Sequence, residues 1–337
     1  MPEAARHWDA FFARELINRP LVCVTAPLPG KPDTPVRGYR ERVFGDMDEA
    51  ILAQVEAARY TYFGGDAVPA AWISFGPDEI AVFCGAELAW SDDSGDTNWS
   101  VACIENWEAA LPIRLRDDHP LYRRLLAMYR RAAELAGGKL LFTAPDLHTN
   151  MDLLAAMRGP QRLCLDLLDC PETVDRAMAD ARAVFPRLWD DIWEAGRIAE
   201  LGATPSTTLQ CDFSCMVSPA MFRRWILPAL EEEAAIVGNV VYHWDGPDAV
   251  VHTLDLLAGR GLHSLAYVPG AGRGGHADYV DLFRRVQAGG KAVSVWGSAD
   301  EVKAMHRDLK PELTAYHTWA ATPQEADKLL EWFVANT

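Results

Sequence analysis

The chain has 337 residues, half of them hydrophobic, which permits a large core and excludes a mainly disordered protein. Its 32 Lys and Arg residues stand against 48 Asp and Glu residues, giving a formal net charge of −16. A surface this acidic repels phosphate backbones and anionic lipid, so nucleic acid and membrane surfaces are excluded as expected partners.

The first residues of the chain, MPEAARHWDAFFARELINRP, are amphipathic and of mixed charge. They lack the apolar centre of a signal peptide. Further along, every uninterrupted apolar run is shorter than the roughly 18 residues that span a bilayer. We therefore expect a cytoplasmic protein without a membrane span.

Short apolar runs with strand character recur along the whole chain. They occupy 21–26, 70–75, 140–143, 207–211, 239–243, 262–268, 291–296 and 313–316. Stretches with helical periodicity separate most of them, at 121–135, 171–195, 219–236, 249–257, 279–287 and 323–334. Short runs that are apolar on both sides are typical of parallel strands covered by helices.

Eight strands that alternate with helices predict an α/β fold: one (β/α)8 barrel of the TIM type that forms a single domain over residues 1–337. A doubly wound open sheet has the same alternation, but no GxGxxG sequence opens the first unit. The long irregular segment 75–106 predicts an elaborated N-terminal region over the barrel mouth. In such a barrel the active site lies where the strands end and the following loops begin.

Polar residues follow the third and fourth of these strands. Asp146, His148 and Asp152 come after the third, and Asp212 comes after the fourth. A carboxylate and an imidazole two residues apart suit a catalytic site, but an Asp that opens a loop is also common. Asp212 is either a catalytic or ligand carboxylate or the first residue of an Asx turn.

The pair His243 and Asp245 ends the fifth strand. Residues i and i+2 of a strand point the same way, so the imidazole and the carboxylate converge. This suits a divalent metal, or an acid–base pair in which the carboxylate orients the imidazole. The alternative is a loop histidine beside an Asp that caps the next helix.

Candidate substrate contacts lie close to the same strand ends. Tyr242, Trp244 and Trp296 are aromatic residues there, and aromatic walls suit a partly apolar organic substrate, although Trp is equally common in a core. Gly270 begins a glycine-rich loop after the sixth strand. Such a loop holds an anion with its backbone amides or is only a flexible turn.

Together with other segments, these residues resemble the uroporphyrinogen decarboxylase superfamily, which includes zinc-dependent, corrinoid-linked methyltransferases that methylate thiols such as coenzyme M. The resemblance extends from about residue 66 to the C-terminus and implies a single (β/α)8 barrel with its site at the carboxyl face. It is carried by Gly65-Asp66-Ala67-Val68-Pro69, Phe75-Gly76-Pro77, Arg158-Gly159-Pro160, Asp169-Cys170-Pro171, Asp212-Phe213-Ser214, Val217-Ser218-Pro219-Ala220-Met221-Phe222, Tyr242-His243-Trp244-Asp245-Gly246-Pro247 and Gly289-Gly290-Lys291.

Two chemistries occur in that superfamily. Its decarboxylases use no metal and hold substrate carboxylates with an arginine-rich N-terminal segment, which this chain lacks. Its methyltransferases bind zinc through a His-x-Cys motif after the fifth strand and a Cys near the last strand. Here the first motif reads His243-Trp244-Asp245, and His317 stands near the last strand. The resemblance therefore implies His243, Asp245 and His317 as ligands of zinc or another divalent metal.

The resemblance implies a metal-dependent methyltransferase or demethylase. A bound metal would lower the pKa of a thiol or alcohol that accepts the methyl group, and Asp212, Asp146 and His148 would bind substrate or transfer protons. The expected partners are a small-molecule substrate and a corrinoid protein, and a homodimer is expected. The alternatives are a metal-free lyase that decarboxylates a small organic acid, and a non-catalytic barrel that binds a small molecule or serves a corrinoid partner.

Overall fold

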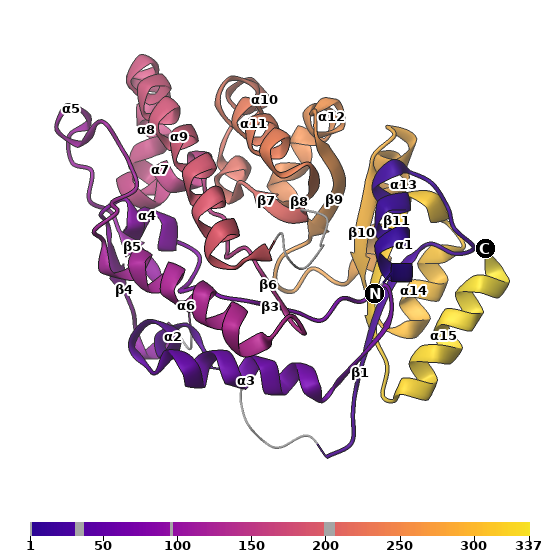
Figure 1. The fold of residues 1–337 in the computed structure, drawn as a ribbon. Helices are drawn as coiled ribbons and strands as arrows, with labels where there is room; N and C mark the ends of the chain where they lie inside the picture. Colours follow the sequence, from indigo (N-terminus) through magenta and orange to yellow (C-terminus); the bar gives the residue numbers. More distant parts are fainter. Residues whose placement is uncertain (1, 31–36, 95–96, 199–205) are drawn as a thin grey trace.

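The computed structural model describes residues 2–30, 37–94, 97–198 and 206–337 (Figure 1). The fold is mixed α/β with a mostly parallel central sheet in the order β2-β1-β11-β10-β9-β8-β7. Its strands are β1 (Leu21–Pro27), β2 (Thr61–Gly65), β7 (Ser206–Gln210), β8 (Asn239–Asp245), β9 (Leu262–Val268), β10 (Ala292–Trp296) and β11 (Thr314–Trp319). Two small sheets pair β3 (Ala70–Trp72) with β6 (Leu141–Thr143) and β4 (Glu87–Ala89) with β5 (Trp99–Val101).

Each of the eight predicted strand runs contains a strand, namely β1, β3, β6 and β7 to β11. The described residues pair them in two groups, because β3 and β6 form a sheet of their own. One edge of β1 pairs in parallel with β11, and its other edge pairs antiparallel with β2. Both edges of β1 are therefore occupied, and β3 does not join it as it would in an uninterrupted ring of eight parallel strands.

Helices cover the sheets and follow most strands (Figure 1). They are α1 (Pro2–Ala13), α2 (Tyr39–Phe44), α3 (Met47–Arg59), α4 (Glu79–Phe83), α5 (Trp107–Ala110), α6 (Pro120–Ala136), α7 (Asn150–Arg158), α8 (Pro160–Asp169), α9 (Pro171–Ala195), α10 (Pro219–Met221), α11 (Leu227–Val237), α12 (Thr253–Ala258), α13 (Val280–Ala288), α14 (Ala299–His306) and α15 (Pro323–Asn336). Several begin with Pro in the first turn, where the missing amide hydrogen costs nothing. Thr322 caps α15 by accepting from the Glu325 amide.

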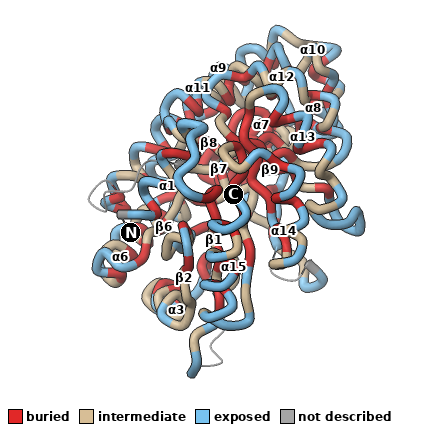
Figure 2. Tube along the Cα trace, turned by 90° about the vertical axis from the view of Figure 1, so that its right-hand side faces the viewer, coloured by how far each residue is buried: buried red, intermediate tan, exposed pale blue. Residues whose placement is uncertain are grey.

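Burial alternates along β8 and explains which of its residues are available to a ligand. Val240, Tyr242 and Trp244 are buried, whereas His243 and Asp245 are half-buried. Successive side chains of a strand point to opposite faces, so the last two belong to the other face of the strand. Figure 2 shows the buried residues concentrated along the strands and on the inner sides of the helices that surround them.

The segment that follows β3 forms α4, β4 and β5 and packs beside α7. The amides of Cys103 and Ile104 both donate to the Met157 carbonyl near the end of α7, at 2.8 and 2.9 Å. The charge of Asp78, just before α4, acts on His148 in the loop after β6, so this predicted elaboration lies close to the carboxyl ends of the strands. No helix in the described ranges is long and apolar enough to cross a membrane.

A candidate active site at the carboxyl ends of the strands

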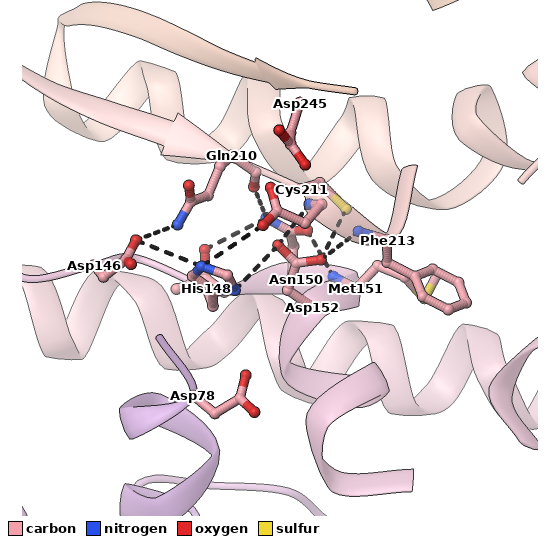
Figure 3. Close-up of polar contacts among 12 residues, drawn as sticks. Asp78, Asp146, His148, Asn150, Met151, Asp152, Gln210, Cys211, Phe213 and Asp245 are labelled. Atoms are coloured by element: carbon pink, nitrogen blue, oxygen red, sulfur yellow. Dashed lines mark hydrogen bonds and ion pairs between the residues drawn. The ribbon is translucent and has the colours of Figure 1, made fainter. Parts of the chain in front are cut away.

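Three strand ends bring a set of acids and imidazoles together. The loop after β6 carries Asp146 and His148 into α7, β7 runs into Asp212 at the start of a 3-10 turn (Asp212–Met216), and β8 ends in His243 and Asp245. β7 and β8 pair in parallel, with Gln210 opposite His243. Figure 3 shows Asp146, His148, Asp152 and Gln210 close together with their polar groups facing one another, whereas the Phe213 ring points away from them.

His148 lies at the centre of this cluster. Its Nε2 is 3.5 Å from Asp146 Oδ1 and 4.0 Å from Asp212 Oδ2, and its Nδ1 is 3.9 Å from Asp152 Oδ2. Burial by itself lowers the pKa of His148, but the surrounding carboxylates outweigh burial and raise it. The surrounding acids therefore stabilise the imidazolium form of His148.

Asp152 fixes the position of the β7 end. Its side chain is only 5% exposed, and it accepts from the Asp212 amide at 2.9 Å and the Phe213 amide at 2.8 Å. Burial raises the pKa of Asp152, while His148 and these amides oppose the rise. The carboxylate thus ties the first turn of α7 to the residue that carries the Asp212 side chain.

In the described part of the chain, no hydrogen-bond donor contacts Oδ1 of the Asp212 carboxyl group. This oxygen is buried, and His243 Nε2 lies 3.9 Å away. Burial, followed by the charges of Asp152 and Asp245, raises the pKa of Asp212 to about 7, against the opposing effect of His148. A carboxyl with that pKa is able both to accept and to donate a proton near neutral pH.

His243 differs from His148 although both face acids. Burial lowers its pKa, and the nearby charge of Asp245, whose Oδ1 is 4.0 Å from His243 Nε2, opposes that effect only in part. The neutral imidazole is therefore favoured. The site contains one imidazole that favours the charged form and one that favours the neutral form, with Asp212 within 4.0 Å of both.

A cavity of about 370 Å³ opens beside this cluster. Asp146 and Gln210 lie on its wall, and Gln210 Nε2 donates to Asp146 Oδ1. Cavities from about 300 Å³ upward hold small organic ligands. The other lining residues among those described are Trp8, Trp72, Thr143, Ala144, Pro145, Leu147, Thr207, Thr208, Val241, Ser294, Trp296 and His317.

This arrangement of strands occurs in a known enzyme structure. The fold is similar to that of a methyltransferase from Methanosarcina mazei, with a TM-score of 0.64 over 99% of this chain and 98% of the other. The two sequences are 13% identical, so the similarity establishes the fold alone. No protein-family model and no curated protein sequence matches the chain.

The predicted substrate contacts separate into two groups. Trp296 lines the cavity, and its side chain is 43% exposed. Tyr242 and Trp244 are each 1% exposed, and neither lines the cavity, because they occupy the face of β8 opposite to His243. Gly270 is exposed, with a φ of 87° and open space where a Cβ would lie. We therefore retain Trp296 and leave the other three out of the proposed site.

His243 and Asp245, two of the predicted zinc ligands, lie close together at the end of β8, and the third, His317, lies in β11. Zinc binds N and O donors at about 2.0 to 2.2 Å, so two ligands of one ion lie about 3 to 4 Å apart. His243 Nε2 and Asp245 Oδ1 are 4.0 Å apart, whereas the His317 ring is stacked on Trp296 with ring centroids 4.5 Å apart. Over the four described ranges, no three His, Cys, Asp or Glu side chains have metal-ligand spacing.

Asp152, one of the polar residues that the sequence places after the third strand, belongs to the site and stands four residues after His148, a spacing that places both on one side of a helix start. Two further residues of the site lie outside the predicted set. Asn150 adopts a φ of 48°, and its Nδ2 donates to the Gln210 carbonyl at 3.2 Å, which links α7 to β7. Glu233 accepts from Thr149 Oγ1 at 2.7 Å from inside the core. Only Asp152 had a signal in the sequence, because the other two contacts connect distant segments.

Proposed function

We propose that the protein is a barrel-type enzyme that transfers a methyl group from a small organic molecule to a thiol or alcohol acceptor. The observation that carries the proposal is the position of Asp212, a carboxyl with an unpartnered oxygen between His148 and His243, next to a cavity of ligand size. The similarity of the fold to a methyltransferase supports the class of reaction.

Methyl transfer to such an acceptor requires removal of one proton. The acceptor's S–H or O–H proton passes to the Asp212 carboxylate, and the freed electron pair forms the new bond to the methyl carbon. The old bond of that carbon breaks, and its pair stays on the leaving group. His148 and Asp152 position Asp212. The His148 Nε2 atom lies 4.0 Å from the Asp212 carboxylate, and the Asp152 carboxylate accepts a hydrogen bond from the Asp212 backbone amide.

The decarboxylase alternative lacks a group to hold its substrate. A small organic acid needs a cationic partner, and the described residues that line the cavity include neither Lys nor Arg. The raised pKa of Asp212 does suit the protonation of a carbanion. A carboxylate substrate in this acidic pocket is nevertheless disfavoured by like charge.

The test is a screen of methylated small molecules with a thiol acceptor, followed by mass spectrometry of the demethylated product. Asp212→Asn keeps the shape and removes the base, and we expect turnover to fall about 10²- to 10⁴-fold. Asp281→Asn, at an exposed carboxylate of α13, is the matched control and keeps wild-type turnover. Equal turnover in Asp212→Asn and the wild type contradicts the assigned role, and release of carbon dioxide from an organic acid supports the lyase instead.

Zinc, a corrinoid protein partner and a homodimer stay predictions from the resemblance. Zinc is tested separately by elemental analysis of the purified wild type and of His243→Ala. One equivalent of zinc that the variant loses supports the ligand prediction. No metal after reconstitution contradicts that prediction.

A further inference from the structure

Tryptophan rings form part of the cavity wall. Trp72 and Trp296 both line it, and their side chains are 38% and 43% exposed. Trp8 lines it as well, with its indole nitrogen donating to the Asp66 carbonyl at 3.0 Å. Large rings left this accessible in a concave surface are typical of a binding site.

The charge of the same cavity has one sign. Among the described lining residues, Asp146 is the acid, and neither Lys nor Arg is present. His317, which also lines the cavity, is kept neutral because burial lowers its pKa to about 4. Asp152, Asp212 and Asp245 add further acids beside the cavity, with His148 as the imidazole that they favour in its charged form.

One cation already lies against an aromatic residue of this wall. The guanidinium of Arg42 is 5.9 Å from the Trp72 ring centroid and 4.8 Å from that of Tyr39, and it donates to the Ser74 carbonyl at 2.9 Å. Arg42 is buried and is not a lining residue. Trp296 carries His317 on one face, in a stack with 14° between the ring planes. Because that imidazole is neutral, it compensates the attraction of Trp296 for a ligand cation less than Arg42 compensates that of Trp72.

We propose that the small molecule bound in this cavity is a methylated organic cation, a quaternary ammonium or a sulfonium, held against Trp296 and Trp72 with Asp146 as its counter-ion. The electron-rich faces of Trp attract such cations, and a carboxylate neutralises their charge. The weak hydration of a methylated cation suits a wall that is mostly apolar. An anionic ligand of the same size would be attracted neither by the Trp faces nor by the Asp146 carboxylate.

The identification of this cation as methyl donor rests on the proposed function. Its C–N or C–S bond breaks, the electron pair stays on nitrogen or sulfur, and a neutral amine or thioether leaves. The acceptor thiol forms the new S–CH3 bond, and its proton passes to Asp212. Atoms and charge balance, because one cation is consumed and one proton is released.

The binding test uses the full chain and a pair of probes that differ in charge alone. Choline and 3,3-dimethylbutan-1-ol have the same shape, with a positive nitrogen in the first and a carbon in the second. Isothermal titration is expected to show choline binding at least tenfold more tightly. Trp296→Leu and Asp146→Asn each weaken choline binding about tenfold, whereas Trp99→Leu, at an exposed ring on β5 outside the cavity, leaves it unchanged.

The wild type alone decides the inference if a variant fails to fold. Equal binding of the two probes, or tighter binding of 3,3-dimethylbutanoate, overturns it. Tetramethylammonium and trimethylsulfonium distinguish the two kinds of cation, and preference for either supports the proposal. If cations bind but no acceptor is ever methylated, the inference stands and the proposed function fails. If a neutral methyl ether is turned over and cations do not bind, the function stands and the inference fails.

Discussion

At the amino end of β1, Asp66 is fully buried and accepts from Arg19 Nη2 at 3.0 Å and the Val22 amide at 2.8 Å, with His7 Nδ1 2.9 Å away. At the carboxyl ends of β7 and β8, acids crowd together with two imidazoles. In the described part of the chain, no ion pair joins Asp146, Asp152, Asp212 or Asp245 to a Lys or Arg.

The difference separates two uses of buried charge. A buried carboxylate such as Asp66, which accepts hydrogen bonds from an arginine and a backbone amide, holds segments of the chain together. Removing it leaves the arginine and the amide without an acceptor. Acids that share few donors repel one another and lower the stability of the fold. A chain keeps such acids where they perform chemistry, so the comparison assigns stability to the Asp66 end and function to the Asp212 end.

The largest effect on stability is expected from Asp66→Asn. The substitution leaves the buried guanidinium of Arg19 without its counter-ion, which costs about 3 to 5 kcal/mol of unfolding free energy. Urea unfolding followed by circular dichroism measures the loss. Asp281→Asn should stay within about 0.5 kcal/mol of the wild type. A small loss in Asp66→Asn would break the distinction between the two ends.

A smaller loss is expected from Asp152→Ala, because two backbone amides donate to this acid. The variant leaves the amides of Asp212 and Phe213 without an acceptor, at a cost of about 1 to 3 kcal/mol. The same unfolding experiment measures it. Turnover should fall as well, through a lower kcat at nearly constant KM, because Asp212 is displaced and not removed. Wild-type kcat in a folded variant would contradict the positioning role.

The pH dependence of stability tests Glu233. Burial raises its pKa to about 8, well above that of an unfolded glutamic acid, so the carboxyl is neutral in the fold at pH 7. The unfolded state therefore loses its proton at lower pH, and stability falls as pH rises, with the loss complete once the pH has passed about 8. Glu233→Gln should flatten this fall in unfolding experiments between pH 6 and pH 9. A variant that keeps the wild-type slope would exclude Glu233 as its cause.

The smallest effect is expected from Asp146→Asn. This substitution removes one of the carboxylates that raise the pKa of His148, the acid 3.5 Å from its Nε2. The pKa of His148 should fall, and titration of its ring protons by nuclear magnetic resonance measures the change. An unchanged value would show that Asp152 and Asp212 set the charge of His148 without it.

The sequence predicts the strands of this fold better than their closure. The eight apolar runs and the polar residues that follow them are local patterns, and the structure contains a strand in each run. The antiparallel strand β2 depends on its pairing with β1, which no local pattern indicates. Closure of eight parallel strands into a ring also depends on pairing between distant segments, so the local pattern does not determine it.

The candidate site shows a similar division. The fold brings together five of the predicted residues, as expected from their places at or after the strand ends. They are Asp146, His148, Asp212, His243 and Asp245. His317 also follows a strand, but β11 lies three strands away from β8 in the sheet, and its imidazole stacks on Trp296. Successive side chains of a strand point to opposite faces, so Trp244 lies on the face of β8 opposite to His243.

Asp212 serves the proposed chemistry at the expense of stability, and unfolding of Asp212→Asn by urea at pH 8 measures that effect. The pKa of Asp212, about 7, lies above that of an unfolded Asp, so the wild type loses stability as the pH rises toward 8. We expect Asp212→Asn to unfold at the same or a higher urea concentration than the wild type, and Asp66→Asn to unfold at a lower one. If Asp212→Asn were destabilised as much as Asp66→Asn, Asp212 would instead be a residue that holds the fold together.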